Sequence, residues 1–221
     1  MGKTAIILGA TGLTGNLLLQ KLISDENYIS IKLFSRKKMD GLPLKVQQFI
    51  GNILELESFK SDFTGDTVFC CIGTTLKKTP DKNIYRSIDF GIPTKAAQLS
   101  KENNIETFMA VSALGANSKS SLFYNKLKGE MEEKVLSFNI KNTYILQPSY
   151  IKGNRNENRS MERVFDVIFP LINLFLIGKL KKYKTIKATT IAEAMYNLAS
   201  LKPIIKKIES DQIKKYAITK N

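Results

Sequence analysis

The stretch IILGATGLTG, residues 6–15, decides the fold of this chain, because an apolar strand runs directly into three glycines and then into a helix. Gly9 lets the backbone turn sharply where the strand ends, and Gly12 lets peptide N–H groups approach a pyrophosphate closely. Gly15 lets the following helix pack against the sheet, and the N-terminus of that helix offers unpaired N–H donors to an anion. The pattern predicts a dinucleotide-binding turn, which also contains Thr11, Leu13 and Thr14.

Glycine-rich turns also join strands to helices for structural reasons alone, so the context of the motif decides its meaning. Residues 4–8 are short and apolar, as in a buried parallel strand, and leucines recur at helical spacing over 13–24. This context favours the dinucleotide interpretation. A nucleoside triphosphate loop needs Gly-Lys-Ser or Gly-Lys-Thr, whereas residues 15–17 are Gly-Asn-Leu, so a kinase or ATPase site is disfavoured.

Length and composition indicate one globular domain. The 221 residues are 43% hydrophobic and 24% charged, enough for one substantial core, so we expect a single domain over residues 1–221. The sequence runs straight into its first predicted strand, which leaves no room for the apolar leader of a secreted protein. We therefore expect a cytoplasmic location.

Two residue types limit the chemistry that is available. The chain has no histidine, which excludes histidine triads, histidine general bases and imidazole metal sites, and we expect no metal centre. Its two cysteines, Cys70 and Cys71, are neighbours in a predicted strand, so they point to opposite faces and form no ordinary disulfide. We expect both to be reduced and buried. Acid–base chemistry must come from Tyr, Lys, Asp, Glu or Cys side chains.

Apolar runs alternate with helical patterns along the chain. This alternation predicts an α/β fold, a Rossmann-like doubly wound parallel sheet with helices on both faces. Residues 149–190 are expected to add a small C-terminal substrate lobe. In such sheets, ligands bind beyond the carboxyl ends of the strands. The predicted strands lie near residues 4–8, 30–35, 45–50, 67–72, 106–112 and 142–147, and the helices near 13–24, 54–61, 83–103, 120–138 and 159–176.

The pattern changes after the sixth strand, where residues 164–177 form a strongly apolar stretch interrupted by Pro170. This stretch is too short to span a bilayer, and we predict no transmembrane segment. We favour a core helix or the wall of a substrate pocket over a subunit interface or a surface-bound membrane segment. A pocket wall of this kind indicates a small, apolar substrate. Further on, capped helices are expected to begin at Thr189 and at Ser210.

The end of the second strand indicates which dinucleotide binds. An NAD site commonly places a carboxylate about 20 residues beyond the last glycine, where it binds the ribose 2′-hydroxyl. Here Ser35 occupies that position, and Arg36, Lys37 and Lys38 follow it. Arg36 can pair with a 2′-phosphate in a planar fork and Lys37 adds a point charge, so NADP(H) is favoured over NAD(H). The alternative is an ordinary basic loop in a lysine-rich chain.

The formal net charge of +14 allows several kinds of partner. A strongly basic chain can attract nucleic acid, anionic lipid or an acidic cofactor. The densest basic run, residues 179–187, interleaves five lysines with apolar residues. We favour a solvated lysine-rich face over an electrostatic binding footprint, and we predict no specific nucleic-acid partner.

Three residues suit hydride-transfer chemistry without histidine. Tyr124 and Lys128 form a Tyr-x-x-x-Lys pattern inside a predicted helix, so they share one helix face. Ser112, at the end of the fifth strand, is expected at the same edge of the sheet. A lysine ammonium and a cationic nicotinamide stabilise phenolate, so Tyr124 would exchange a proton with the substrate while Ser112 donates to the substrate oxygen. Alone, the Tyr-x-x-x-Lys pattern is common by chance; its combination with the glycine motif favours a site.

The chain resembles the short-chain dehydrogenases/reductases, and more narrowly their atypical branch of small NAD(P)H-binding oxidoreductases that includes the Tat-interacting-protein-like proteins. The resemblance covers nearly the whole chain. It is carried by GATGLTG at 9–15, FSR at 34–36, CIGTT at 71–75, SALGA at 112–116 and YNKLKGE at 124–130.

The resemblance implies NADP(H) in a Rossmann cleft and Ser112, Tyr124 and Lys128 as the catalytic set. It also implies that Gly73 and Thr74 pass under the adenosine and pyrophosphate, and that Asn52 lies near the adenine. One departure is Gln147-Pro148-Ser149, where relatives often read Arg-Pro-Gly. Further cofactor contacts are expected from Ile53, Cys71, Ile72, Pro148 and Ile151, together with Tyr124 and Lys128.

Two functions from different classes remain open at this point. The first is an NADP(H)-dependent oxidoreductase that acts on a small carbonyl or alcohol substrate through Ser112, Tyr124 and Lys128. The second is an NADP(H)-binding, redox-sensing regulator with little or no catalysis, which presents a cofactor-dependent surface to a partner. The intact catalytic set favours the enzyme. Either protein would be a monomer or a homodimer.

Overall fold

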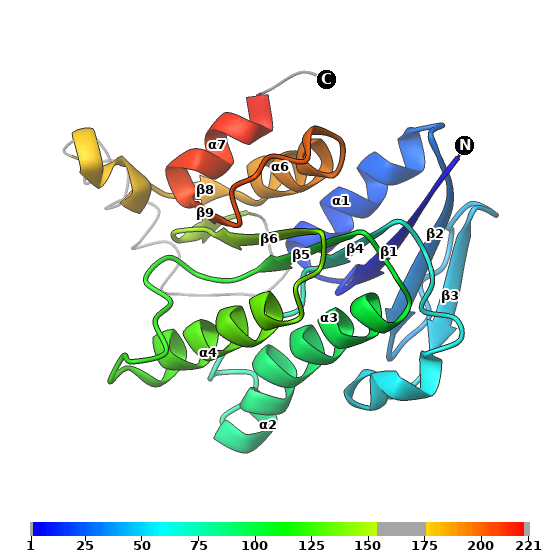
Figure 1. Ribbon diagram of the computed structural model, residues 1–221, viewed down its shortest axis with the longest axis horizontal. Coiled ribbons are helices and arrows are strands. Elements are labelled where there is room, and N and C mark those ends of the chain that lie inside the picture. The colour runs from blue at the N-terminus through cyan, green and yellow to red at the C-terminus, as the bar shows by residue number, and fades with distance from the viewer. Residues whose placement is uncertain (1, 154–175, 219–221) are drawn as a thin grey trace.

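A computed structural model describes residues 2–153 and 176–218, which form a seven-stranded sheet with helices on both faces (Figure 1). The strand order is β3-β2-β1-β4-β5-β6-β9, and every neighbouring pair in this sheet is parallel. A separate two-stranded parallel sheet pairs β7 with β8. The strands are β1 (Lys3–Leu8), β2 (Tyr28–Ser35), β3 (Val46–Ile50), β4 (Thr67–Cys70), β5 (Thr107–Val111), β6 (Asn142–Gln147), β7 (Ile151–Lys152), β8 (Ile186–Lys187) and β9 (Lys207–Glu209).

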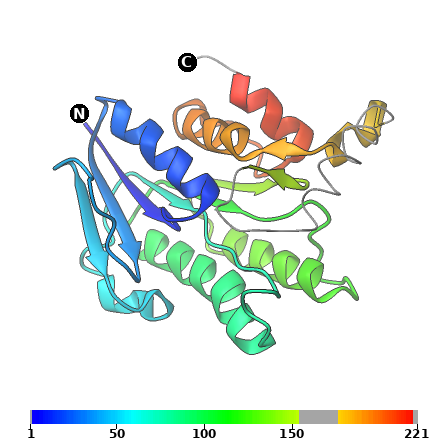
Figure 2. The ribbon, with the colours of Figure 1, turned by 180° about the vertical axis from the view of Figure 1, so that it is seen from behind.

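The helices lie in two layers, which Figure 2 shows from behind. Helices α1, α6 and α7 cover one face of the sheet, and η1, α3 and α4 cover the other. The helical elements are α1 (Leu13–Ser24), the 3₁₀ helix η1 (Ile53–Phe59), α2 (Lys82–Arg86), the π turn η2 (Ser87–Gly91), α3 (Ile92–Glu102), α4 (Phe123–Ser137), the 3₁₀ helix η3 (Gly178–Tyr183), α6 (Ala188–Leu201) and α7 (Ser210–Ile218).

Alternation along the central strands divides the core into two clusters. In β1, Ala5 and Ile7 pack toward α1 and α6, whereas Ile6 and Leu8 pack toward α3 and α4, because successive side chains of a strand point to opposite faces. All four are completely buried. Both faces of the sheet are therefore covered, which explains why the central strands are apolar throughout.

The strand order reverses direction at β1, which lies between β2 and β4. From β1 the chain first builds outward to β2 and β3, and then crosses back to β4, β5 and β6 on the other side. The loops after β1 and β4 consequently leave the sheet on opposite faces and open a crevice between them, the usual ligand position in doubly wound sheets. The fold expected from the sequence is confirmed.

Some elements differ from the sequence prediction. The helix expected over 83–103 is three pieces, α2, η2 and α3, because a π turn interrupts it, and the helix expected over 54–61 is the 3₁₀ helix η1. The short strands β7, β8 and β9 were not predicted, since two or three residues leave no recognisable alternation. The residue that precedes α6 is Lys187, without a side-chain cap, in place of the expected Thr189.

The C-terminal region is described only in part. Residues 154–175, which include the helix expected over 159–176 and most of the apolar stretch 164–177, lie outside the described residues. The β7–β8 pair and η3 are the described parts of the expected substrate lobe, 149–190. Helix α7 begins at Ser210, as the sequence predicted. Among the helices of residues 2–153 and 176–218, none has the length and apolar character to cross a membrane.

Candidate functional site

The turn after β1 has the shape that its glycines require. Gly9 adopts a φ of +85°, a conformation that side chains disfavour, and a Cβ on Gly15 would overlap the carbonyl oxygen of Gly9. Gly12 precedes α1, and no side chain caps the N-terminus of this helix. The first-turn N–H groups of α1 are therefore available to an anion, and the helix dipole favours negative charge there.

Replacing Gly15 with alanine should abolish cofactor binding, because the added methyl group collides with the Gly9 backbone and forces the turn away from α1. Titration of NADPH against the variant, followed by fluorescence, measures the loss. Gly91→Ala is the matched control, since the nearest atom to a Cβ there is 3.9 Å away. Wild-type affinity in the Gly15 variant would contradict the role of this turn.

A cleft of about 1020 Å³ opens at the carboxyl edge of the sheet. It is bounded by the turn after β1, the segment after β4, the end of β5, the start of α4, and the β7–β8 pair. The sequence-predicted site residues that line it are Thr11, Gly12, Leu13, Thr14, Cys71, Ile72, Gly73, Thr74, Ser112, Tyr124, Lys128 and Ile151. Those that do not are Gly9, Gly15, Ser35, Arg36, Lys37, Asn52, Ile53 and Pro148.

Two of the residues expected at the adenosine end, Ser35 and Asn52, form hydrogen bonds with residues close to them in the sequence. Ser35 is buried at the end of β2, and its hydroxyl donates to the carbonyl oxygen of Lys37 at 2.7 Å. The side chains of Arg36 and Lys37 are exposed. The Asn52 amide caps η1, because its oxygen accepts from the Leu54 N–H and its nitrogen donates to Glu55. Asn52 thus has a structural role that the sequence did not indicate.

Lys128 forms a buried ion pair with Asp89, a residue that the sequence analysis missed. The ammonium nitrogen lies 2.8 Å from the Asp89 Oδ1, and the two side chains are 3% and 1% exposed. The second carboxylate oxygen accepts from the backbone N–H of Thr74 at 2.7 Å. Burial opposes the charged ammonium, but Asp89 and Tyr124 outweigh it and raise the pKa of Lys128 above its ordinary value.

Tyr124 is the second residue of α4, and its side chain lines the same cleft. The residue is 39% exposed, but desolvation on the protein side raises the pKa of the phenol; Lys128 lowers it, Asp89 raises it further, and the net shift is upward. Lys128 acts on the phenol in the direction that the sequence predicted, but desolvation outweighs it, and Asp89 adds to the rise. The phenol is protonated at neutral pH.

Ser112 follows β5 and is 4% exposed. Its hydroxyl donates to the Oε1 of Glu132 at 2.5 Å, and Glu132 is completely buried on α4, one turn beyond Lys128. The Gln147 amide donates to both oxygens of this carboxylate at 2.9 and 3.0 Å, and the Lys207 ammonium lies 2.8 Å from Oε2. Spacing of four from Lys128 was the one sequence signal that could have identified Glu132.

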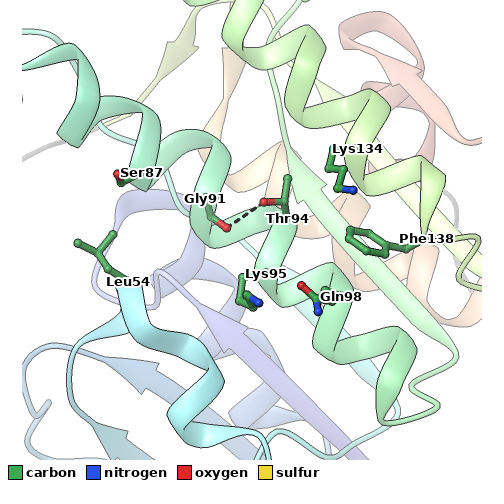
Figure 3. Close-up of a pocket in the computed structure, with 8 residues that line it drawn as sticks. All are labelled: Leu54, Ser87, Gly91, Thr94, Lys95, Gln98, Lys134 and Phe138. Carbon is green, nitrogen blue, oxygen red and sulfur yellow. Dashed lines mark hydrogen bonds between the residues drawn. The ribbon is translucent and has the colours of Figure 1, made fainter.

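A second pocket, of about 380 Å³, lies away from this cleft, on the outer side of α3 (Figure 3). Figure 3 shows Leu54 of η1, Lys95 and Gln98 of α3, and Lys134 of α4 around it. Lys95 is paired with Glu57 at 3.0 Å. None of the sequence-predicted site residues lines this pocket, so the larger cleft is the candidate site.

Comparison with known proteins identifies the family. No protein-family model matches the chain. "Protein FMP52, mitochondrial" of Debaryomyces hansenii is 33% identical over 161 residues, which cover 72% of this chain and 71% of that protein. "Protein HTATIP2" of Rattus norvegicus is 30% identical over 164 residues, which cover 72% and 67%. The chain belongs to the HTATIP2 and FMP52 family. This family places it among the atypical short-chain dehydrogenases/reductases.

Solved structures share the fold of this chain. UDP-glucose 4-epimerase of Thermotoga maritima, solved with UDP-glucose, has a TM-score of 0.70 and 14% identity, and the match covers 96% of this chain and 80% of that one. UDP-glucuronic acid 4-epimerase of Bacillus cereus, solved with NAD, has a TM-score of 0.68 and 14% identity, with coverage of 93% and 76%. At this identity the likeness shows the fold alone.

The relatives correct one expectation from the sequence. The cytoplasmic location is contradicted, because FMP52 proteins of Debaryomyces hansenii, Candida glabrata and Candida albicans are named as mitochondrial. The sequence argument weighed only the apolar leader of secreted proteins, and mitochondrial proteins are addressed by amphipathic, basic segments. That argument could not separate the compartments within a cell.

Proposed function

We propose that the chain is an NADP(H)-dependent reductase of a small carbonyl compound. The observation that carries the proposal is that one cleft is lined by the α1 N-terminus, by the Tyr124 phenol and by the Lys128 ammonium. These groups supply, in one place, an anion site for a dinucleotide and a proton donor for a substrate. Membership of an oxidoreductase-like family supports the same activity.

The residues of the cleft are suited to a dinucleotide. The uncapped N-terminus of α1 would hold the pyrophosphate, and Gly73 would allow the cofactor to pass close to the segment after β4. Lys128 has ammonium protons left after its bond to Asp89, and these would hold ribose hydroxyls. When bound, the reduced cofactor supplies a hydride. Several structural neighbours are described as NAD complexes, which agrees with this class of ligand.

Tyr124 would act as the acid of the reaction. Its raised pKa keeps the proton on Oη at neutral pH, so the phenol can donate a hydrogen bond to a carbonyl oxygen and then transfer the proton as the alcohol forms. Lys128 limits the cost of the phenolate that remains. A protonated phenol suits carbonyl reduction better than alcohol oxidation, which begins with the base form.

The choice of NADP(H) over NAD(H) depends on Arg36, which is exposed just beyond β2. Arg36→Ala should weaken NADPH binding at least tenfold and leave NADH binding nearly unchanged, because a bidentate guanidinium–phosphate pair is lost. Calorimetric dissociation constants for both cofactors give the measurement. Lys141→Ala removes one positive charge just before β6, outside the cleft, and controls for net charge. Equal affinities of the unmodified protein for the two cofactors would overturn the assignment.

The activity itself is tested by following NADPH absorbance with a panel of small aliphatic and aromatic aldehydes and ketones. Turnover of one panel member supports the reductase. If the cofactor binds and no panel member reacts, the redox-sensing regulator becomes the better account. The apolar character of the substrate stays a prediction, because it came from residues 164–177, most of which lie outside the described residues.

A further inference from the structure

We propose that Glu132 fixes the Ser112 hydroxyl as a hydrogen-bond acceptor toward the cleft, so that the site selects carbonyl substrates carrying a hydroxyl or amino donor near the reacting carbon. This inference rests on the proposed reductase activity, because only a reductase would turn over a carbonyl substrate. Its structural basis, the contacts of Ser112, is independent of that activity.

The Ser112 hydroxyl has one proton and two lone pairs. The proton is directed at Glu132 Oε1, 2.5 Å away, on the buried side of the residue. Ser112 also lines the cleft. The bond to Glu132 uses the proton and leaves both lone pairs of the oxygen for a ligand there. A ligand in the cleft therefore meets an acceptor at this position. This is the reverse of the donor role that the sequence suggested for Ser112.

The surroundings of Glu132 keep it in the acceptor form. Its carboxyl oxygens receive donors from Ser112, from the Gln147 amide and from the Lys207 ammonium. A carboxylate is acceptor-only, which matches this set of three donors. Because a hydrogen bond to a charged group is about twice as strong as a neutral one, a substrate carbonyl does not compete with Glu132 for the single serine proton.

The hydroxyls of Ser112 and Tyr124 consequently have different tasks. Tyr124 is protonated and is the donor for the reacting carbonyl oxygen. Ser112 presents lone pairs, which would repel that oxygen but accept from a neighbouring O–H or N–H of the ligand. A hydroxy ketone satisfies both groups, whereas a plain ketone leaves the buried Ser112 lone pairs without a partner. Glu132 acts here as a positioning residue, through Ser112.

The test compares 1-hydroxy-2-butanone with 2-butanone, a pair that differs by one hydroxyl group. Two quantities are measured, kcat/KM with reduced cofactor and Kd with oxidised cofactor, which needs no turnover. The wild type should prefer the hydroxy ketone about fivefold to tenfold in both, the usual worth of one hydrogen bond. Ser112→Ala should bring this ratio to about one. If Ser112→Ala lowers kcat/KM and affinity by the same factor for both ketones, Ser112 donates to the carbonyl, and the inference is overturned.

Glu132→Gln separates positioning from a merely structural role. A glutamine can turn its NH₂ group toward Ser112, which frees the serine proton to face the cleft. The preference for the hydroxy ketone in kcat/KM and Kd should therefore fall, and kcat/KM for 2-butanone should rise. Structural damage would lower kcat/KM equally for both ketones. Glu133→Gln, the same substitution at the next residue, where the side chain bonds to Ser118 instead, is the control and should keep the ratio.

The outcomes also distinguish this inference from the proposed function. A Kd preference for the hydroxy ketone that disappears in Ser112→Ala, without turnover of any carbonyl compound, supports the acceptor role and refutes the reductase. Turnover of both ketones with no preference in either quantity refutes the acceptor role and keeps the reductase. Absence of any preference in Kd counts against the inference in every case.

Discussion

Tyr124→Phe should reduce the turnover of a carbonyl substrate by about 10²- to 10⁴-fold, the usual contribution of a positioned proton donor. The variant loses only the phenolic oxygen, so the ring still lines the cleft beside Lys128. NADPH dissociation constants should change little, because the pyrophosphate cradle after β1 is untouched. Initial rates at saturating cofactor, with binding measured in parallel, give the two numbers.

Tyr85→Phe is the matched control for this experiment. The Tyr85 hydroxyl donates to the carbonyl oxygen of Thr74 at 3.2 Å, and the residue does not line the cleft. Removing that hydroxyl should cost less than tenfold in rate. A Tyr124 variant that keeps more than a tenth of wild-type turnover would be incompatible with Tyr124 as the acid, and would favour the regulator.

Lys128→Met should destabilise the fold by about 3–5 kcal/mol, because it leaves the Asp89 carboxylate buried without its cation. Neither side chain is more than 3% exposed, so solvent cannot compensate the charge that remains. The methionine fills most of the lysine volume, which confines the effect to the lost ion pair. Urea unfolding followed by circular dichroism measures the free energy of unfolding.

A double variant identifies the cause of that loss. Lys128→Met combined with Asp89→Asn removes both charges, and the asparagine oxygen can still accept from the Thr74 N–H. Much of the stability should return, because an uncharged pair carries no desolvation penalty of this size. If the double variant is no more stable than the single one, the damage arises from packing and the charge argument fails.

The strongest sequence signals were those in which local spacing determines the structure. The turn of residues 6–15 was predicted with its strand and helix, since three glycines and an apolar period fix that geometry locally. Ser112, Tyr124 and Lys128 were placed together because parallel strands end at one edge of the sheet, and the structure brings all three to the cleft. Their chemical roles remain predictions.

The remaining features depend on partners that are distant in sequence. Asp89 lies in a π turn that no helical period predicts, and its importance comes from Lys128, 39 positions later on another helix. The environment of Tyr124 and the hydrogen bond of Ser112 to Glu132 also depend on such partners, which residue spacing does not reveal. Burial of a charge is a property of the packed chain, and the sequence does not display it.

The contact between Glu132 and Lys207 joins α4, which carries residues of the candidate site, to β9 at the edge of the sheet. Through this contact, the orientation of a hydroxyl at residue 112 depends on a residue of β9 that is translated almost a hundred positions later. The glycine turn, the tyrosine and the lysine all lie in the first two thirds of the chain. A shortened chain cut from that part would keep the glycine turn, the tyrosine and the lysine, and would lack the cation that pairs with Glu132.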